Sequence, residues 1–268
     1  MTETNDGQTL EKEHTLEKFR GDKRDNGIFA KIFDNSVTSA LHTLAARGVF
    51  DVIEYVISTG KEAHVFRART SGGKFLAIKI YKLETSDFKN MEKYIRGDER
   101  FKKTKTDRRG LVYEWTRKEF KNLERARECG VKVPLPIAFM KNILVLEFIG
   151  DEKGNAPMLK DCKDADYQAV YDKIIEYVAR LVYVGKLVHA DISEFNILMW
   201  NDEPVIIDIG QGVLTSHPRA KEFFDRDVEN ISRYFSKKGV EKSTEDVLTD
   251  LRKWKEQLEK PKKNAILP

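Results

Sequence analysis

The 268-residue sequence has little cysteine and no long apolar run. Its two cysteines, Cys129 and Cys162, lack the spacing of a metal site or of a disulfide framework, which indicates reduced thiols. No stretch approaches the roughly 20 apolar residues that a membrane span needs, and the polar N-terminus has no apolar segment of signal-peptide length. We therefore expect a soluble, cytoplasmic protein with no membrane association.

Neither sign of charge dominates the chain. Its 48 basic and 44 acidic residues give a net charge of +4, so the overall balance identifies no partner. Internal repeats and low-complexity segments are also missing, which excludes solenoid and fibrous architectures. A hydrophobic content of 40% and a charged content of 34% are typical of a globular protein, and the length suits two lobes.

The first half of the chain alternates between helical and strand periodicity. Residues 1–26 carry no apolar pattern and are expected to form a flexible charged tail, followed by a helix from about Ile28 to Gly48. A five-stranded antiparallel sheet and one long helix, over about 112–128, are predicted next. The expected strands are 56–57, 64–69, 74–81, 137–140 and 143–148. The highly charged stretch 86–110 has little apolar pattern and is predicted to be a flexible loop.

The second half of the chain is predicted to be mainly helical. Residues 150–157 have the composition of a hinge, and helices are expected over 167–184, over about 219–235 and after an N-cap at Ser243. The sequence thus predicts an α+β fold of two lobes, 27–149 and 150–268.

One short segment carries the strongest chemical signal. Asp191 is followed five positions later by Asn196, and Asp208 ends an apolar stretch further on. Phosphoryl transfer needs a carboxylate near the attacking hydroxyl and oxygen ligands that hold Mg²⁺ against the nucleotide phosphates. The spacing matches the kinase pattern H-x-D-x-x-x-x-N, with Asp191 as base and Asn196 as metal ligand. Single Asp and Asn residues usually cap or turn loops, but three so close together favour catalysis.

A lysine among apolar strand residues is the second signal. A buried ammonium group needs a partner, so Lys79 is expected to reach the nucleotide phosphates and to pair with a glutamate of the long helix. Glu119 is the best candidate, and Glu114 and Glu124 are the alternatives. Solvent exposure at a strand edge is the ordinary explanation for such a lysine.

The turn Ser58-Thr59-Gly60-Lys61-Glu62-Ala63 is a weaker signal. Backbone N–H groups of such a turn can approach phosphate oxygens, and Lys61 would add positive charge. The turn lacks the G-x-G-x-x-G of ordinary protein kinases and is not a Walker A loop, so taken alone it is equally well an ordinary β-turn.

Together these segments resemble one family, the RIO atypical serine/threonine kinases, and its type-1 branch in particular. The resemblance covers about 30–240. It is carried by the residues 58–65, the catalytic segment 187–198, and Ile207-Asp208-Ile209-Gly210-Gln211, with further agreement at 146–150, 156–161, 217–218 and 223–228. It implies a two-lobed protein-kinase-like fold with a shortened helical C-lobe, because no A-P-E segment follows Asp208.

The resemblance also implies roles for single residues. Asp191 would be the catalytic base, Asn196 and Asp208 would bind Mg²⁺ (or Mn²⁺), and Lys79 with Glu119 would clamp the ATP phosphates. Asp208 could also accept a phosphoryl group as an aspartyl-phosphate. The residues expected to contact the nucleotide are Ser58, Gly60, Lys61, Glu62 and Val65 in the phosphate loop, and the backbone of Glu147 and Ile149 at the adenine.

A basic run from Arg100 to Arg109 contains six basic residues and one acidic residue. A solvated loop is the ordinary interpretation, and contact with RNA phosphates is the functional one. The family resemblance favours RNA, because RIO kinases act in maturation of the small ribosomal subunit, so a pre-40S or 30S-type particle and its rRNA are the expected partners. Thr104, Thr106 and Ser86 are hypothetical autophosphorylation sites.

Two other functions stay open at this stage. A small-molecule phosphotransferase of the aminoglycoside or choline kinase type shares the H-x-D-x-x-x-x-N pattern, although such enzymes usually have a larger C-lobe. An ATP-binding, ribosome-associated scaffold with little turnover is the other alternative. The oligomeric state is left open by the sequence.

Overall fold

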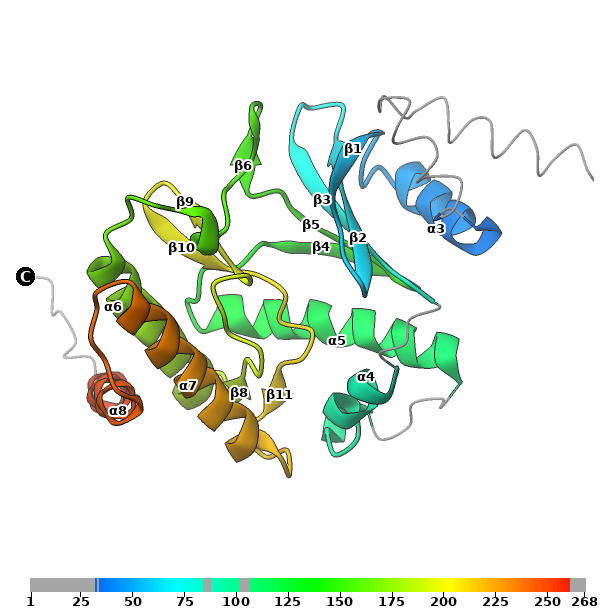
Figure 1. The fold of residues 1–268 in the computed structure, drawn as a ribbon. Coiled ribbons are helices and arrows are strands. Elements are labelled where there is room, and N and C mark those ends of the chain that lie inside the picture. Colours follow the sequence, from blue (N-terminus) through cyan, green and yellow to red (C-terminus); the bar gives the residue numbers. More distant parts are fainter. Residues whose placement is uncertain (1–31, 33, 84–87, 102–106, 261–268) are drawn as a thin grey trace, which may run out of the picture. The chain divides into compact units, whose positions relative to one another are not determined.

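The computed structural model describes residues 32, 34–83, 88–101 and 107–260 (Figure 1). The predicted tail 1–26, the start of the first helix at Ile28, and the candidates Ser86, Thr104 and Thr106 lie outside these residues. By their mutual contacts the described residues form two units. The first unit comprises those within Met1–Lys93, Lys103–Phe120 and Leu135–Asn155, and the second comprises those within Tyr94–Lys102, Lys121–Pro134 and Ala156–Pro268.

The first unit contains the predicted five-stranded antiparallel sheet, in the order β1-β2-β3-β5-β4. Its strands are β1 (Val52–Thr59), β2 (Ala63–Arg69), β3 (Phe75–Tyr81), β4 (Pro136–Met140) and β5 (Ile143–Glu147). A small hairpin follows, made of β6 (Gly150–Asp151) and β7 (Gly154–Asn155). Helix α3 (Asn35–Ala46) begins at the N-cap Asp34, whose side chain accepts a hydrogen bond from the Val37 N–H.

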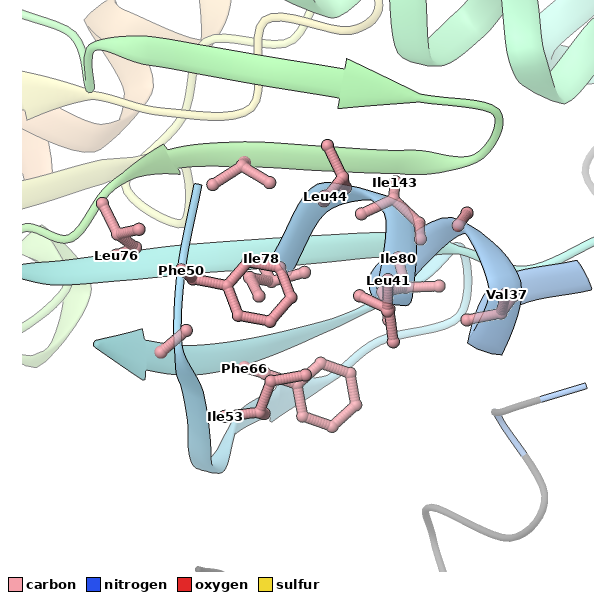
Figure 2. Packing of buried hydrophobic residues seen from close by; sticks show 13 residues of the cluster. Val37, Leu41, Leu44, Phe50, Ile53, Phe66, Leu76, Ile78, Ile80 and Ile143 are labelled. Carbon is pink, nitrogen blue, oxygen red and sulfur yellow. The ribbon is translucent and has the colours of Figure 1, made fainter. Parts of the chain in front are cut away.

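Strand β3 shows how alternation places the important side chains. Leu76, Ile78 and Ile80 belong to the buried cluster that the sheet forms with α3, shown in Figure 2. Because successive strand residues point to opposite faces, Lys79 and Tyr81 lie on the other face. Both of them contact Glu119 on helix α5 (Arg108–Glu128), whose first part belongs to this unit.

The structure corrects three boundaries. Strand β1 begins at Val52 and not at Val56, because residues from Val52 onward pair with β2. Helix α5 begins at Arg108, four residues earlier than predicted. The stretch 86–110 is not a loop throughout, since it contains α4 (Phe88–Ile95) and the 3₁₀ turn η1 (Glu99–Phe101).

Helix α4 was not predicted from the sequence because it is short and strongly charged. Its buried side chains Met91, Tyr94 and Ile95 follow the i, i+3, i+4 spacing, but they occupy less than two turns. Among the residues of the stretch whose side chains the structure describes, Phe101 is also buried.

The second unit is mainly helical, as predicted. Its helices are α6 (Tyr167–Ala179), which continues into a π-helical turn (Arg180–Val184), α7 (Ala220–Lys237) and α8 (Thr244–Glu259), with a 3₁₀ turn η2 (Leu159–Asp161). Its strands form two short antiparallel pairs, which are β8 (Leu187–Val188) with β11 (Val213–Leu214) and β9 (Ile197–Trp200) with β10 (Glu203–Ile206). The predicted lobes 27–149 and 150–268 stay a prediction. The contact-based units interleave along the chain, and the last of their boundaries falls after Asn155, within the predicted hinge.

Two expectations about the chain as a whole can be compared with the described residues. Both cysteines are free thiols in the structure. Among the helices that the structure describes, we find none with the length and apolar character of a membrane span.

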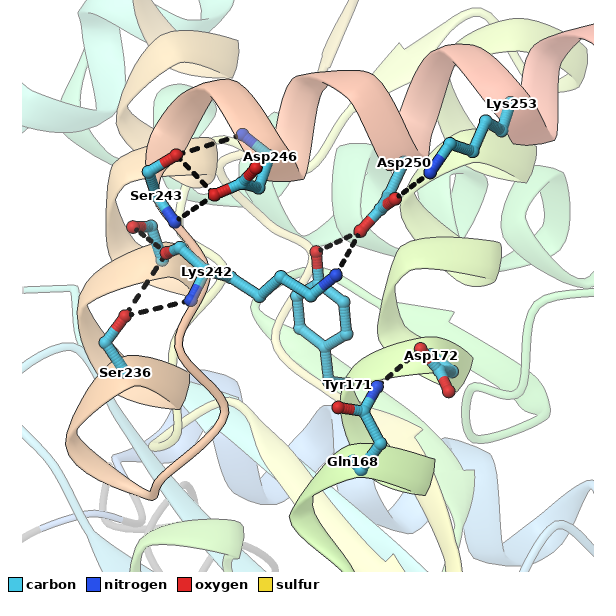
Figure 3. Close-up of polar contacts among 10 residues, drawn as sticks. Gln168, Tyr171, Asp172, Ser236, Lys242, Ser243, Asp246, Asp250 and Lys253 are labelled. Atoms are coloured by element: carbon cyan, nitrogen blue, oxygen red, sulfur yellow. Dashed lines mark hydrogen bonds and ion pairs between the residues drawn. The ribbon is translucent and has the colours of Figure 1, made fainter.

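Helix α8 is fastened to α6 by one carboxylate, shown in Figure 3. Ser243 forms the predicted N-cap as a capping box with Asp246, and Asp250 one turn later accepts hydrogen bonds from Tyr171 (3.0 Å) and Lys242 (2.9 Å). Lys253 donates to the other carboxylate oxygen at 2.9 Å. Burial alone would raise the pKa of Asp250, but these three donors lower it to about 2.

Asp250→Asn should therefore destabilise the protein at pH 7 by about 1–2 kcal/mol, allowing for the partial solvent exposure of the site. Because the folded pKa of Asp250 lies below its ordinary value of 3.8, its contribution is present above about pH 4 and is lost as the pH falls toward 2. Urea unfolding of both proteins between pH 7 and pH 2.5 measures this difference. Asp172→Asn, at an exposed carboxylate bonded only to Gln168 in Figure 3, is the control. A difference that persists unchanged at pH 2.5 would contradict the assignment.

Candidate active site

The first unit holds the predicted lysine–glutamate pair. Lys79 Nζ lies 2.9 and 3.0 Å from the two carboxylate oxygens of Glu119. The side chain of Glu119 is only 1% exposed and that of Lys79 is 10% exposed, so each charge depends on the other. Tyr81 adds a hydroxyl donor to the same carboxylate, and its ring lies 4.9 Å from the ammonium nitrogen.

This pairing confirms Glu119 as the choice among the three candidate glutamates. Glu114 instead bonds Arg117 at 3.1 Å, and Glu124 is exposed in the second unit. A buried ammonium held by a carboxylate keeps its position, as a phosphate ligand requires. The role of Lys79 at the phosphates stays a prediction.

The predicted phosphate loop is the connection between β1 and β2. Ser58, Gly60 and Lys61 are exposed, Glu62 is half-buried, and Val65 pairs with Lys79 across β2 and β3. The loop is held closed by backbone hydrogen bonds from Gly60 N–H to the Ala63 carbonyl and from Lys82 N–H to the Glu62 carbonyl, both 2.9 Å.

A second lysine, Lys82, also contacts the predicted phosphate loop, and it was given no role from the sequence. Lys82 Nζ donates to the Gly60 carbonyl at 2.7 Å, which places a cation beside the loop and orients the carbonyl toward it. Lys82 could not be identified from the sequence, because it follows the end of β3 in a stretch without a polar or apolar pattern.

The predicted adenine-binding segment follows β5. The Glu147 N–H donates to the Leu135 carbonyl at 2.9 Å, and the Glu147 carboxylate accepts from the Leu135 N–H at 3.0 Å. Ile149 is half-buried, and the chain then turns at Gly150, where a Cβ would lie 2.3 Å from the Gly154 carbonyl oxygen. Glycine is therefore required at this turn. These hydrogen bonds hold the backbone of Glu147 in place, and the contact of Glu147 and Ile149 with adenine stays a prediction.

Arg67 supports the same segment from β2. Its guanidinium donates to the Asp151 carbonyl at 3.2 Å and lies 4.4 Å from the centre of the Phe75 ring. Glu54 compensates its charge at 2.6 Å. Planar stacking and bidentate donation are properties of arginine that lysine lacks.

The second unit holds the catalytic segment between β8 and β9. Asn196 Nδ2 donates to the Asp191 backbone carbonyl at 2.8 Å and to its carboxylate at 3.2 Å. Gln211 Nε2 donates to the same carboxylate oxygen at 3.0 Å. Because the amide nitrogen of Asn196 is used in this way, its Oδ1 is the atom left to bind a metal ion.

Two residues of α7 hold the backbone around Asp191. The buried Asp227 accepts hydrogen bonds from the Ala190 N–H (2.7 Å) and the Ile192 N–H (3.0 Å). Arg226 donates to the Ala190 carbonyl. Burial raises the pKa of Asp227 to about 7, although the two N–H groups and Arg226 oppose this shift.

These bonds keep Ala190 at a φ of 68°, in the left-handed region. An alanine adopts this conformation at a cost of about 1–2 kcal/mol, so surrounding interactions must enforce it. The carboxylate of Asp191 is thereby directed by bonds made to its neighbours.

Asp208 follows β10 and also has a left-handed backbone, at a φ of 57°. Its side chain is exposed. The donor set of a carboxylate and an amide oxygen suits Mg²⁺, which prefers one or two protein oxygens together with substrate phosphates and water. Among the described residues no cluster of three or more His, Cys, Asp or Glu side chains forms a self-sufficient metal cage.

Each unit thus brings together its own predicted residues. Lys79 and Glu119 meet in the first unit, and Asp191 and Asn196 meet in the second. Gln211, Arg226 and Asp227 had been given no role, although they lie in segments that carried the family resemblance. Their function depends on which backbone atoms they reach, and spacing alone does not encode that.

Comparison with known proteins places the chain among kinases. The family model of the RIO domain matches residues 64–248. The RIO-type serine/threonine-protein kinase Rio1 of Haloferax volcanii is 39% identical over 233 residues, covering 86% of this chain and 80% of that protein. Rio1 of Thermoplasma acidophilum is 42% identical over 189 residues, covering 70% and 99%. A crystal structure of the Rio2 kinase of Chaetomium thermophilum has a TM-score of 0.58 and 24% identity, over 82% of this chain and 76% of that one, which confirms the kinase-like fold.

Proposed function

Because the chain belongs to the RIO family of atypical serine/threonine kinases, we propose that it transfers the γ-phosphoryl group of ATP from a Mg²⁺ complex held by Asn196 and Asp208. Asp191 acts as the general base toward the attacking hydroxyl or water. Lys79, fixed by Glu119, contacts the phosphates, and the phosphate loop around Gly60 covers them. Bound Mg²⁺ would neutralise the charge that develops on the transferring group.

One observation carries this assignment, namely the orientation of the Asn196 amide. Its nitrogen donates to the backbone carbonyl and to one carboxylate oxygen of Asp191, so Asn196 orients the base and presents an oxygen to the metal ion. Gln211 adds a second donor to the Asp191 carboxylate. A hydrogen-bonded carboxylate is held in one rotamer, and general-base catalysis depends on that positioning.

We further propose that Asp208 accepts the phosphoryl group as a transient aspartyl-phosphate. The Rio2 kinase of C. thermophilum has been crystallised as an ADP/Mg²⁺-phosphoaspartate complex, which makes this route reasonable for a relative. One Asp208 oxygen would attack the γ-phosphorus, and the bond to the β,γ-bridging oxygen would break with its electron pair leaving on ADP. Water activated by Asp191 would then release phosphate and restore the carboxylate. The exposure of the Asp208 side chain supports access to the nucleotide.

Asp191→Asn should reduce Mg²⁺-dependent ATP turnover by about 10²–10⁴-fold, because transfer to a hydroxyl or to water loses its base. The measurement is phosphate release from γ-labelled ATP by the full chain, with the melting temperature recorded for both proteins. Asp172→Asn again serves as the control, since this exposed carboxylate bonds only Gln168. Near-wild-type turnover in Asp191→Asn would refute the assignment of the base.

As the cellular partner we propose a small ribosomal subunit particle and its rRNA. Support comes from the basic run 100–109, of which Arg108 and Arg109 are exposed in the described part. Arg100 is committed to Asp98 and Asn122, so fewer than the six basic residues are available to phosphates. RNA binding through this run should weaken steeply with salt, and a titration of an rRNA fragment at several salt concentrations tests it. Affinity that does not depend on salt would exclude this surface.

A further inference from the structure

A buried asparagine ties the loop after Asp208 to the segment before α5. Asn122 Nδ2 donates to the carbonyls of Ile209 and Gly212, both at 2.9 Å, and its Oδ1 accepts from Arg100 Nη1 at 2.8 Å. We propose that Asn122 is a positioning residue for the metal ligand Asp208, with Arg100 and Asp98 as its support. The inference rests on the proposed function, because it assumes that Asp208 binds Mg²⁺.

All three polar groups of the Asn122 amide form hydrogen bonds. Both of its N–H donors and its oxygen are used, and the residue is fully buried. Arg100 is oriented in turn by Asp98, with Nε 2.9 Å from Oδ1 and Nη2 2.6 Å from Oδ2. Since the Asp98 side chain is completely buried, this bidentate pair is fixed in one arrangement.

The hydrogen bonds of Asn122 act directly on the turn that follows Asp208. The Gly212 N–H bonds the Ile209 carbonyl at 3.1 Å, and Asn122 holds the carbonyls at both ends of this turn. A Cβ on Gly212 would lie 3.0 Å from Asn122 Nδ2, so a side chain here would have to push Asn122 or the turn aside by a few tenths of an ångström. Ile209 is the residue immediately after Asp208, so Asn122 restrains the backbone one residue beyond the left-handed Asp208.

The same segment also reaches the catalytic loop. The Tyr94 hydroxyl accepts a hydrogen bond from Arg226 at 3.2 Å, and Arg226 donates to the Ala190 carbonyl next to Asp191. His217 Nε2 bonds the Arg96 carbonyl at 2.8 Å, and Gly97, with a φ of 93°, packs on Pro218. The segment Tyr94–Phe101 thus supports Ala190 through Arg226, and Ile209 through Asn122.

An ordinary structural amide would also be buried and bonded, so the test must separate positioning from stability. Asn122→Asp keeps the volume and the acceptor for Arg100 but cannot donate to the two carbonyls. We expect the Mg²⁺ concentration for half-maximal ATP turnover to rise about 10–100-fold, as is typical when a residue that supports a metal ligand is lost. The Kd of ATP measured without Mg²⁺ should change less than threefold.

Asn142→Asp is the matched control, because Asn142 is equally buried and its Nδ2 donates to the Tyr81 carbonyl at 2.7 Å. This variant should lower the melting temperature without moving the Mg²⁺ midpoint. If Asn122→Asp fails to fold, Arg100→Lys gives a second test, since it keeps the charge but removes the guanidinium fork. It should move the midpoint in the same direction by about 3–10-fold.

The inference is overturned if Asn122→Asp or, where that variant fails to fold, Arg100→Lys has the Mg²⁺ midpoint of the wild type. Failure of the proposed function is distinguishable from this outcome. In that case turnover by the wild-type protein itself would not depend on Mg²⁺, or would survive Asp208→Asn.

Discussion

Asp208→Asn is expected to lower ATP turnover by about 10³-fold or more. The substitution removes the negative charge that binds Mg²⁺ and the oxygen that would accept a phosphoryl group, and a metal ion contributes several kcal/mol to such transition states. Asparagine adopts the left-handed conformation readily, so the backbone at a φ of 57° should be kept. The measurement is Mg²⁺-dependent phosphate release from γ-labelled ATP. Acid-quenched wild-type protein should also carry a hydroxylamine-sensitive label that the variant lacks.

Asp202→Asn is a closely matched control for this experiment. Asp202 is also exposed and has a φ of 60°, but it lies in the turn between β9 and β10. Turnover by Asp202→Asn should remain within twofold of the wild type. If Asp208→Asn retained more than a tenth of wild-type turnover, Asp208 would be neither an essential metal ligand nor the phosphoryl acceptor. A wild-type label that resists hydroxylamine would exclude the aspartyl-phosphate alone.

Lys79→Met is expected to have the largest effect on stability, about 3–5 kcal/mol. The variant leaves the Glu119 carboxylate 1% exposed and without its ammonium partner at 2.9 Å. Turnover should fall as well, since the phosphates lose a positive charge. Urea unfolding at pH 7 measures the free energy of unfolding, and phosphate release measures turnover.

The double variant Lys79→Met/Glu119→Leu separates the two effects. Removing both charges eliminates the buried carboxylate that has lost its ammonium partner, so most of the lost stability should return, while turnover stays low because the phosphates lack the Lys79 cation. Lys221→Met is the control at an exposed pair, since Lys221 is 87% exposed beside Asp225 and should cost less than about 1 kcal/mol. Turnover restored in the double variant would show that Lys79 serves the fold and not the phosphates.

The sequence predicted the large elements well, because they depend on local periodicity. The sheet, the long helix and the N-cap at Ser243 all follow from apolar spacing and from capping chemistry, and the structure confirms them. Lys79 was also predictable, since a lysine between apolar strand residues needs a buried partner. Glu119 was the best of three candidate glutamates, and the structure pairs it with Lys79, whereas Glu114 bonds Arg117.

The supporting residues could not be predicted in the same way. Asn122 reaches carbonyls nearly ninety positions away in the chain, and Asp227 reaches N–H groups more than thirty positions away. Backbone atoms are the same at every residue, so no side-chain pattern marks which of them a distant amide or carboxylate will bind. Helix α4 was missed for another reason, since a charged helix of eight residues gives too few apolar repeats to reveal a period.

The two hydrogen bonds between α7 and Ala190 suggest a way in which related sequences could lose activity. Consecutive residues, Arg226 and Asp227, hold the carbonyl and the N–H of one alanine. A homologue could keep both Asp191 and Asp208 yet lack this dipeptide. The backbone before its catalytic aspartate would then be unrestrained, and the carboxylate would no longer be held in one orientation. We expect such homologues to bind nucleotide and to be inert as transferases. An intact set of reactive side chains is therefore an incomplete criterion for an active enzyme.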